Sequence, residues 1–82
     1  MINVLYFASV KERIGRAGEE VSYRQEINTE RLLDSLIEKG EPWSVVLDKE
    51  SLLVAVNQEM AGWDVEIKDG DEVAFFPPVT GG

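Results

Sequence analysis

The chain has 82 residues, 44% of them apolar and 29% charged, which is typical of one small globular domain. It contains neither cysteine nor histidine, which excludes a Cys/His zinc site, a disulfide framework, a catalytic thiol and a Ser-His-Asp triad built from this chain alone. Sixteen acidic residues against eight basic ones give a formal charge of −8, and the basic residues do not cluster along the sequence, so no nucleic-acid partner is expected.

A strand opens the predicted fold, over residues 2–7, where bulky and β-branched residues alternate. The alternation turns three side chains toward a core: Ile2, Val4 and Tyr6. A short helix is expected over residues 9–14, because Ser9 and Glu12 have the spacing of a capping box and Gly15 provides the stop.

The clearest predicted helix follows a second strand, which we expect over residues 20–25. Asn28 or Thr29 can cap this helix, and Lys39 followed by Gly40 is a typical C-terminal end. Its apolar side chains form one stripe: Leu32, Leu33, Leu36 and Ile37.

The second half of the chain predicts further strands. Residues 43–47 fit either a helical turn or an irregular core segment, and the pattern leaves this open. A strand over residues 52–56, a weak strand through Met60 and Trp63, and a last strand over residues 72–76 complete the order. Since one amphipathic helix covers only one face of a small sheet, we expect an α+β roll.

The domain boundaries are predicted at residues 1–76 for the folded part and 77–82 for an extended C-terminal tail. The N-terminus lacks the basic stretch of a secretory signal. No apolar run before the tail is longer than that at residues 52–56, which is far shorter than the roughly 20 residues that cross a bilayer. We therefore expect a soluble, cytoplasmic protein with no membrane partner.

Strand alternation also predicts an exposed apolar patch. Phe7 and Phe76 point away from the core side of their strands, and Met60 is expected nearby. Four more residues share that side: Leu5, Leu53, Ala55 and Ala74. Such a patch usually marks a contact surface, whereas the alternative is that the short helix or a loop covers it. The acidic turn at residues 69–72 lacks the ligand spacing of a calcium loop and is expected to be a plain hairpin-type turn.

The C-terminus is the main candidate for chemistry, because no side chain from Val73 onward is charged. The tail consists of Pro77, Pro78, Val79, Thr80, Gly81 and Gly82. Glycine has no side chain, so the carboxylate of Gly82 can pass down a narrow channel toward a partner's reactive groups. Adenylation would activate that carboxylate, and sulfur or amine attack would then give a thiocarboxylate or an isopeptide bond. The alternative is a frayed terminus.

Four stretches, residues 4–8, 12–15, 53–58 and 69–82, resemble the small, sulfur-carrying subunit of molybdopterin synthase, a ubiquitin-like β-grasp family. The run from the acidic turn through the paired phenylalanines and prolines to the double glycine is the most specific part. The resemblance implies a mixed sheet with one main helix packed on one face and a flexible Gly-Gly tail.

The resemblance further implies that a ubiquitin-activating-enzyme-like adenylyltransferase uses ATP to adenylate Gly82, and that a sulfur-donating enzyme helps convert it to a thiocarboxylate. The tail, from Pro77 to Gly81, would insert into the large synthase subunit. There Gly82 would donate sulfur to cyclic pyranopterin monophosphate and form the molybdopterin dithiolene. Phe7, Met60 and Phe76 would dock on the large subunit in a heterotetramer. This chain would bind no metal or cofactor and provide no catalytic side chain.

Other functions remain open at this point. A thiamine-pathway sulfur carrier would share the fold and the double glycine, although the Phe-Phe-Pro-Pro-Val-Thr run argues against it. A ubiquitin-like modifier would be conjugated to target lysines through Gly82. An interaction module without tail chemistry would tolerate deletion of the tail.

Overall fold

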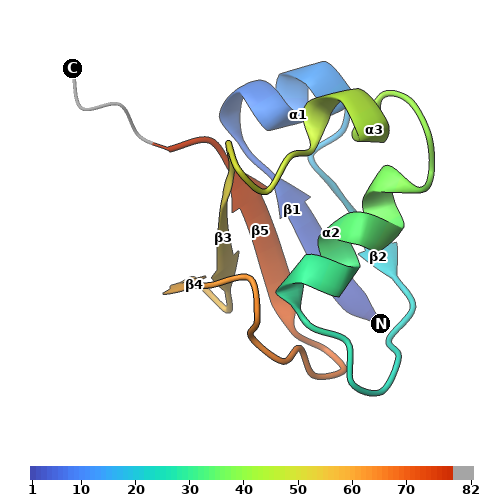
Figure 1. Cartoon of the computed structure of the whole chain (residues 1–82), viewed down its shortest axis with the longest axis vertical. Coiled ribbons are helices and arrows are strands. Elements are labelled where there is room, and N and C mark those ends of the chain that lie inside the picture. Colours follow the sequence, from blue (N-terminus) through green and yellow to red (C-terminus); the bar gives the residue numbers. More distant parts are fainter. Residues whose placement is uncertain (79–82) are drawn as a thin grey trace.

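The structure is a computed structural model that describes residues 1–78 (Figure 1). The predicted tail residues Val79, Thr80, Gly81 and Gly82 lie outside the described residues. The elements are β1 (Ile2–Tyr6), α1 (Ala8–Ile14), β2 (Gly18–Val21), α2 (Thr29–Ile37), α3 (Trp43–Val46), β3 (Leu53–Val56), β4 (Glu59–Ala61) and β5 (Glu72–Phe76). Within this part of the chain, none of the helices has the length and apolar character needed to span a membrane.

A five-stranded mixed sheet forms the body of the molecule, in the order β2-β1-β5-β3-β4. β1 and β5 run parallel, and the other neighbouring strands are antiparallel. α2 crosses one face of this sheet, and α1 and α3 lie together at one end (Figure 1). The expected α+β roll, with one main helix on one face of a mixed sheet, is therefore confirmed.

The core lies between α2 and the sheet, as the two periodicities predict. From the strands, Ile2, Val4, Tyr6, Val73 and Phe75 are almost fully buried. From the helix, the core receives Leu32, Leu33 and Leu36, while Ile37 is only partly buried at the end of the stripe.

The first helix and the second strand differ from prediction. α1 begins at Ala8 with Phe7 at the N-cap position, and no side chain caps it, so the predicted capping box is wrong. β2 spans Gly18–Val21 rather than residues 20–25. It begins earlier because it pairs along β1 from Leu5 back to Ile2, and residues 22–25 belong to the loop that follows it. A Cβ atom at Gly18 would lie 2.3 Å from the carbonyl oxygen of Val4, so this close approach requires glycine.

α2 begins as predicted, with the Asn28 side chain accepting a hydrogen bond from the backbone N–H of Arg31 at 2.8 Å. Thr29 is fully buried and has a different role. Its hydroxyl donates to the carbonyl of Gly62 at 2.6 Å and its N–H donates to the carbonyl of Val65. These bonds tie the segment after β4 to the start of α2. Residues 43–47, for which the sequence left a helical turn and an irregular segment as alternatives, contain the short helix α3.

Glu19, on β2, is the centre of a polar cluster beside the core. Its carboxylate accepts hydrogen bonds from the Tyr6 hydroxyl at 2.7 Å, from the Trp43 indole N–H at 2.9 Å and from Lys39. Lys39 also lies over the Trp43 ring, 4.1 Å from its centroid. Burial opposes ionisation of Glu19, but these hydrogen bonds outweigh it and lower the pKa of Glu19 below its ordinary value of 4.5.

Replacing this carboxylate by an amide (Glu19→Gln) is expected to cost about 2 kcal/mol of unfolding free energy at neutral pH, since charge-assisted hydrogen bonds are lost at a side chain only 10% exposed. A lowered pKa stabilises the fold above the unfolded-state pKa, and this contribution is lost as the pH falls through the folded-state pKa. Urea unfolding should therefore show the two proteins converging below pH 4.5. Glu20→Gln, at an exposed neighbour, is the control. An equal loss at neutral and acidic pH would contradict this account.

Candidate functional site

The sheet face opposite α2 carries an apolar row that crosses all five strands. The strand registers bring five residues into line: Gly18, Leu5, Ala74, Ala55 and Met60. They face away from α2 because the residues next to them along the strands, such as Val4 and Val73, point into the core. This row forms the floor and one margin of the candidate site.

A groove of about 790 Å³ opens over this row, at the end of β5 from which the chain continues toward its C-terminus. Phe7 and Phe76 line it, together with the two prolines Pro77 and Pro78. Leu5, Ala55 and Ala74 contribute from the strands, and we call this surface the apolar groove. The two phenylalanines that strand alternation placed on this face therefore lie in one concave surface.

The exposed fractions of the apolar side chains show whether this face is open to a partner or is covered by the short helix or a loop. The Phe7 residue is 48% exposed and the Met60 residue is 63% exposed, so neither α1 nor a loop covers them. Phe76 is half-buried, and the small residues Ala55 and Ala74 are buried by their neighbours. Met60 does not line the groove itself, but it pairs with Ala55 in the groove floor. The predicted patch is therefore exposed at Phe7 and Met60 but not at Ala55 and Ala74, and Leu53 does not line the groove. The docking role of Phe7, Met60 and Phe76 stays a prediction.

Two residues of the groove were missed by sequence reasoning, Ala8 and Gln58. Both adopt positive φ angles, 54° and 69°, at the points where the chain leaves β1 and β3. Asn57 also has a positive φ, and together with Gln58 it makes the two-residue connection typical of a tight hairpin. The turn was predictable from the polar run, but its position over the groove depends on the order of the strands.

The acidic turn before β5 is structural. The Asp71 carboxylate accepts hydrogen bonds from the Asn57 amide at 3.0 Å and from the backbone N–H of Lys68 at 2.8 Å. The Asn57 hydrogen bond, followed by that from Lys68, lowers the pKa of Asp71. The backbone N–H of Asp71 also closes the turn onto the carbonyl of Lys68 at 3.0 Å. The prediction of a turn is confirmed, but it is not a hairpin, because β4 and β5 are not neighbours in the sheet.

The chemistry available in the groove is limited. Among the residues of the described part of the chain that line it, only Glu72 carries an ionisable side chain. The backbone N–H of Glu72 donates a hydrogen bond to the side-chain oxygen of Asn57 at 3.0 Å. A surface of this kind is suited to contact with an apolar partner, and its described lining contains no acid-base pair.

The family model described as the ThiS family matches residues 4–82. The chain belongs to the ThiS family. Among curated proteins, this ThiS-family chain is 43% identical to the "Molybdopterin synthase sulfur carrier subunit" of Haemophilus influenzae, over the whole of both chains.

Solved structures give the same fold for this ThiS-family chain. A putative molybdopterin converting factor, subunit 1, from Pyrococcus furiosus is 30% identical, with a TM-score of 0.80 over 95% of this chain and 97% of that one. Small archaeal modifier protein 1 from Haloferax volcanii is 27% identical, with a TM-score of 0.76 over 99% of this chain and 98% of that one. These matches, with the observed strand order, confirm the ubiquitin-like β-grasp fold.

Proposed function

We propose that this chain is the sulfur-carrier subunit of molybdopterin synthase and that its sulfur is carried on the C-terminal carboxyl group of Gly82. One observation supports the proposal most directly. The chain is similar over its full length to a molybdopterin synthase sulfur carrier subunit, and its sequence continues from the apolar groove through Pro77 and Pro78 to a double glycine. The four residues after Pro78 span at most about 14 Å when extended. A partner seated on the groove is therefore within reach of the terminal carboxylate.

The loading chemistry uses the terminal carboxylate as substrate. An oxygen of the Gly82 carboxylate attacks the α-phosphate of ATP on the partner adenylyltransferase, and pyrophosphate leaves. A sulfur nucleophile at the oxidation level of hydrosulfide, provided by the sulfur-donating enzyme, then displaces AMP and leaves a thiocarboxylate. No side chain of the carrier takes part, in keeping with a chain that has no cysteine and no histidine.

Delivery of the sulfur takes place in the large subunit. The thiocarboxylate sulfur attacks a carbon of cyclic pyranopterin monophosphate and displaces an oxygen substituent of that carbon, which leaves with a proton supplied by the large subunit. Water then hydrolyses the resulting thioester at the Gly82 carbonyl. Gly82 returns to a carboxylate, and the sulfur stays on the product. The dithiolene needs two such transfers. The acids, bases and substrate contacts belong to the large subunit, which we expect to bind the apolar groove through Phe7, Met60 and Phe76. Since loading consumes ATP, we place the protein in the cytoplasm.

A second candidate function is that of a ubiquitin-like modifier. The 27% identity to an archaeal modifier protein supports this candidate. The two functions share adenylation of Gly82 and differ in the nucleophile that follows, which is sulfur for a carrier and a lysine amine for a modifier. Blotting cell extracts for covalent adducts separates them, since a carrier leaves none. The curated relative and the Pyrococcus structure described above carry molybdopterin names, which favours the molybdopterin carrier over the thiamine-pathway carrier.

Intact-mass analysis tests the proposal. Chain co-expressed with its adenylyltransferase and sulfur-donating enzyme should contain a fraction heavier by the replacement of one oxygen atom by one sulfur atom. Fragmentation should place the added mass on Gly82. A chain extended by one residue after Gly82 is the matched control and should gain no sulfur. Added mass on an internal residue would contradict the proposal.

A further inference from the structure

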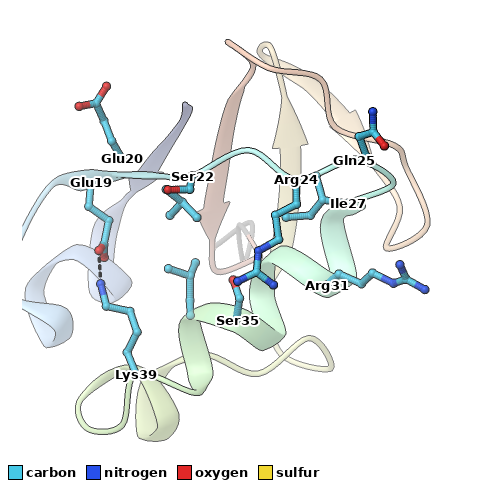
Figure 2. Close-up of a pocket in the computed structure, with 11 residues that line it drawn as sticks. Glu19, Glu20, Ser22, Arg24, Gln25, Ile27, Arg31, Ser35 and Lys39 are labelled. Carbon is cyan, nitrogen blue, oxygen red and sulfur yellow. Dashed lines mark hydrogen bonds and ion pairs between the residues drawn. The ribbon is translucent and has the colours of Figure 1, made fainter.

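A second groove, of about 570 Å³, lies between β2 and α2 and shares no lining residue with the apolar groove (Figure 2). Its apolar lining is made by Val21, Ile27 and Leu36, of which Leu36 and Ile27 are buried and Val21 is half-buried. Polar and charged side chains from β2, the following loop and α2 surround this lining. We call this surface the β2–α2 groove. It combines an apolar floor with a charged rim, as sites for peptide segments do.

One wall of the β2–α2 groove is a free sheet edge, because β2 is the terminal strand and pairs only with β1. The backbone N–H of Tyr6 donates to the carbonyl of Ala17 at 2.8 Å, which sets the alternation of hydrogen-bonded pairs between the two strands. In that alternation the backbone groups of Gly18 and Glu20 point away from β1. They are available to another strand.

The rim carries positive charge in a chain whose formal charge is −8. Arg24, Arg31 and Lys39 are far apart in the sequence, yet the fold brings them to one groove. Lys39 is paired with Glu19. Arg24 and Arg31 are exposed and form no ion pair within residues 1–78. Within these residues, the guanidinium group of Arg31 makes a single long hydrogen bond, of 3.5 Å to the carbonyl of Glu26.

The placement of these groups fits an extended segment better than a single small anion. Arg24 reaches from the loop toward Ser35, whereas Arg31 extends along α2 in another direction, so the two guanidinium groups do not converge on one point (Figure 2). Arg31 and Ser35 are four residues apart on the helix, a rise of about 6 Å. Alternate side chains of an extended strand are spaced by about 6.7 Å, a close match. Glu20 also lines the groove, and its side chain points to the opposite side of β2 from that of Glu19 (Figure 2).

We propose that the β2–α2 groove binds an extended segment of a partner protein, in which carboxylates alternate with apolar residues and which pairs with the free edge of β2. The carboxylates contact Arg24 and Arg31, and the apolar residues cover Val21 and Leu36. Because this site is separate from the apolar groove, such a partner can hold the carrier while the tail is engaged elsewhere. The site does not depend on the tail chemistry, so it stands even if the proposed function fails.

The test is an NMR titration of the full chain with a short capped peptide in which aspartate and valine alternate. We expect shifts at the backbone amides of Gly18, Glu20 and Ser22, and no comparable shifts at Phe7 or Met60. Two control peptides should bind at least about fivefold more weakly: one with asparagine in place of every aspartate, because its ion pairs are lost, and one with a central proline, because proline cannot donate to the ladder.

Variants of the chain assign the contacts. Arg24→Gln and Arg31→Gln should each raise the peptide Kd by about fivefold at low salt, and less at high salt. Arg13→Gln removes the same charge from an exposed position on α1 and should leave the Kd unchanged. The proposal is overturned by equal binding of the asparagine peptide, by shifts confined to the apolar groove, or by no binding. Inorganic phosphate producing the same shifts as the peptide would identify a simple anion site, which also overturns it.

Discussion

Deletion of Gly82 should abolish sulfur transfer while leaving the folded domain unchanged. The proposed reaction takes place at the last carboxyl group, and removing one residue draws it back by about 3.5 Å. A displacement of only 1 Å in a reacting group can cost about a hundredfold in rate, so a shift of this size leaves no measurable transfer. Every residue of the hydrophobic core lies at or before Phe75, so the thermal unfolding midpoint should not change.

The comparison is made in a synthase assay with purified large subunit. A chain with one residue added after Gly82 should be equally inactive, because the altered register misplaces the carboxyl group in the opposite direction. Asp34→Asn, at an exposed position on α2, should keep full activity and controls for handling of the protein. Molybdopterin formation by the shortened chain would rule out chemistry at Gly82.

Truncation of Phe7 to alanine should weaken binding of the large subunit by about 30-fold, or about 2 kcal/mol, without unfolding the chain. Phe7 is a large aromatic residue, 48% exposed, and it lines the apolar groove together with Pro77 and Pro78, where the tail begins. Aromatic residues that become buried on binding contribute most to interfaces of this kind. Since the ring is only half covered in the free chain, its loss should cost little stability.

Val45→Ala provides a matched control for that experiment. Val45 is apolar and 61% exposed, but it lies on α3 and does not line the apolar groove. Isothermal titration calorimetry should give the wild-type affinity for this variant. An unchanged affinity for Phe7→Ala, or an equal loss for Val45→Ala, would place the docking surface elsewhere.

Side-chain alternation and helical periodicity predicted the fold where burial alone determines the structure. Val73 and Phe75 are buried because strand alternation turns them toward α2, and the stripe on α2 is buried for the corresponding reason. The Asn28 cap was predictable because the interaction is local, between a side chain and a backbone N–H three residues later.

The wrong predictions concern contacts between distant residues. Ser9 and Glu12 have the spacing of a capping box, but the chain enters α1 directly from β1, so Phe7 takes the cap position. The start of β2 is set by its pairing with β1 at Gly18, a contact that the alternation within residues 20–25 does not contain. Longer-range pairing therefore overrides the local pattern at both places.

The candidate site shows the same division. Phe7 and Phe76 were predictable from alternation, because each follows directly from the parity of its own strand. The β2–α2 groove was not predictable, since Arg24 and Arg31 line one groove only because the loop after β2 lies beside α2. The chemistry at Gly82 was inferred from the composition of the tail, which lies outside the described residues.

A single-turnover reaction tests the central claim most directly. Carrier loaded with sulfur at Gly82 is mixed with excess large subunit and cyclic pyranopterin monophosphate, with no other sulfur source, and both the carrier mass and the dithiolene product are followed. The account predicts that each carrier chain loses one sulfur atom, that Gly82 returns to a carboxylate, and that one dithiolene forms for every two carriers consumed. Dithiolene formation while the carrier keeps its sulfur, or loss of sulfur without product, would contradict it.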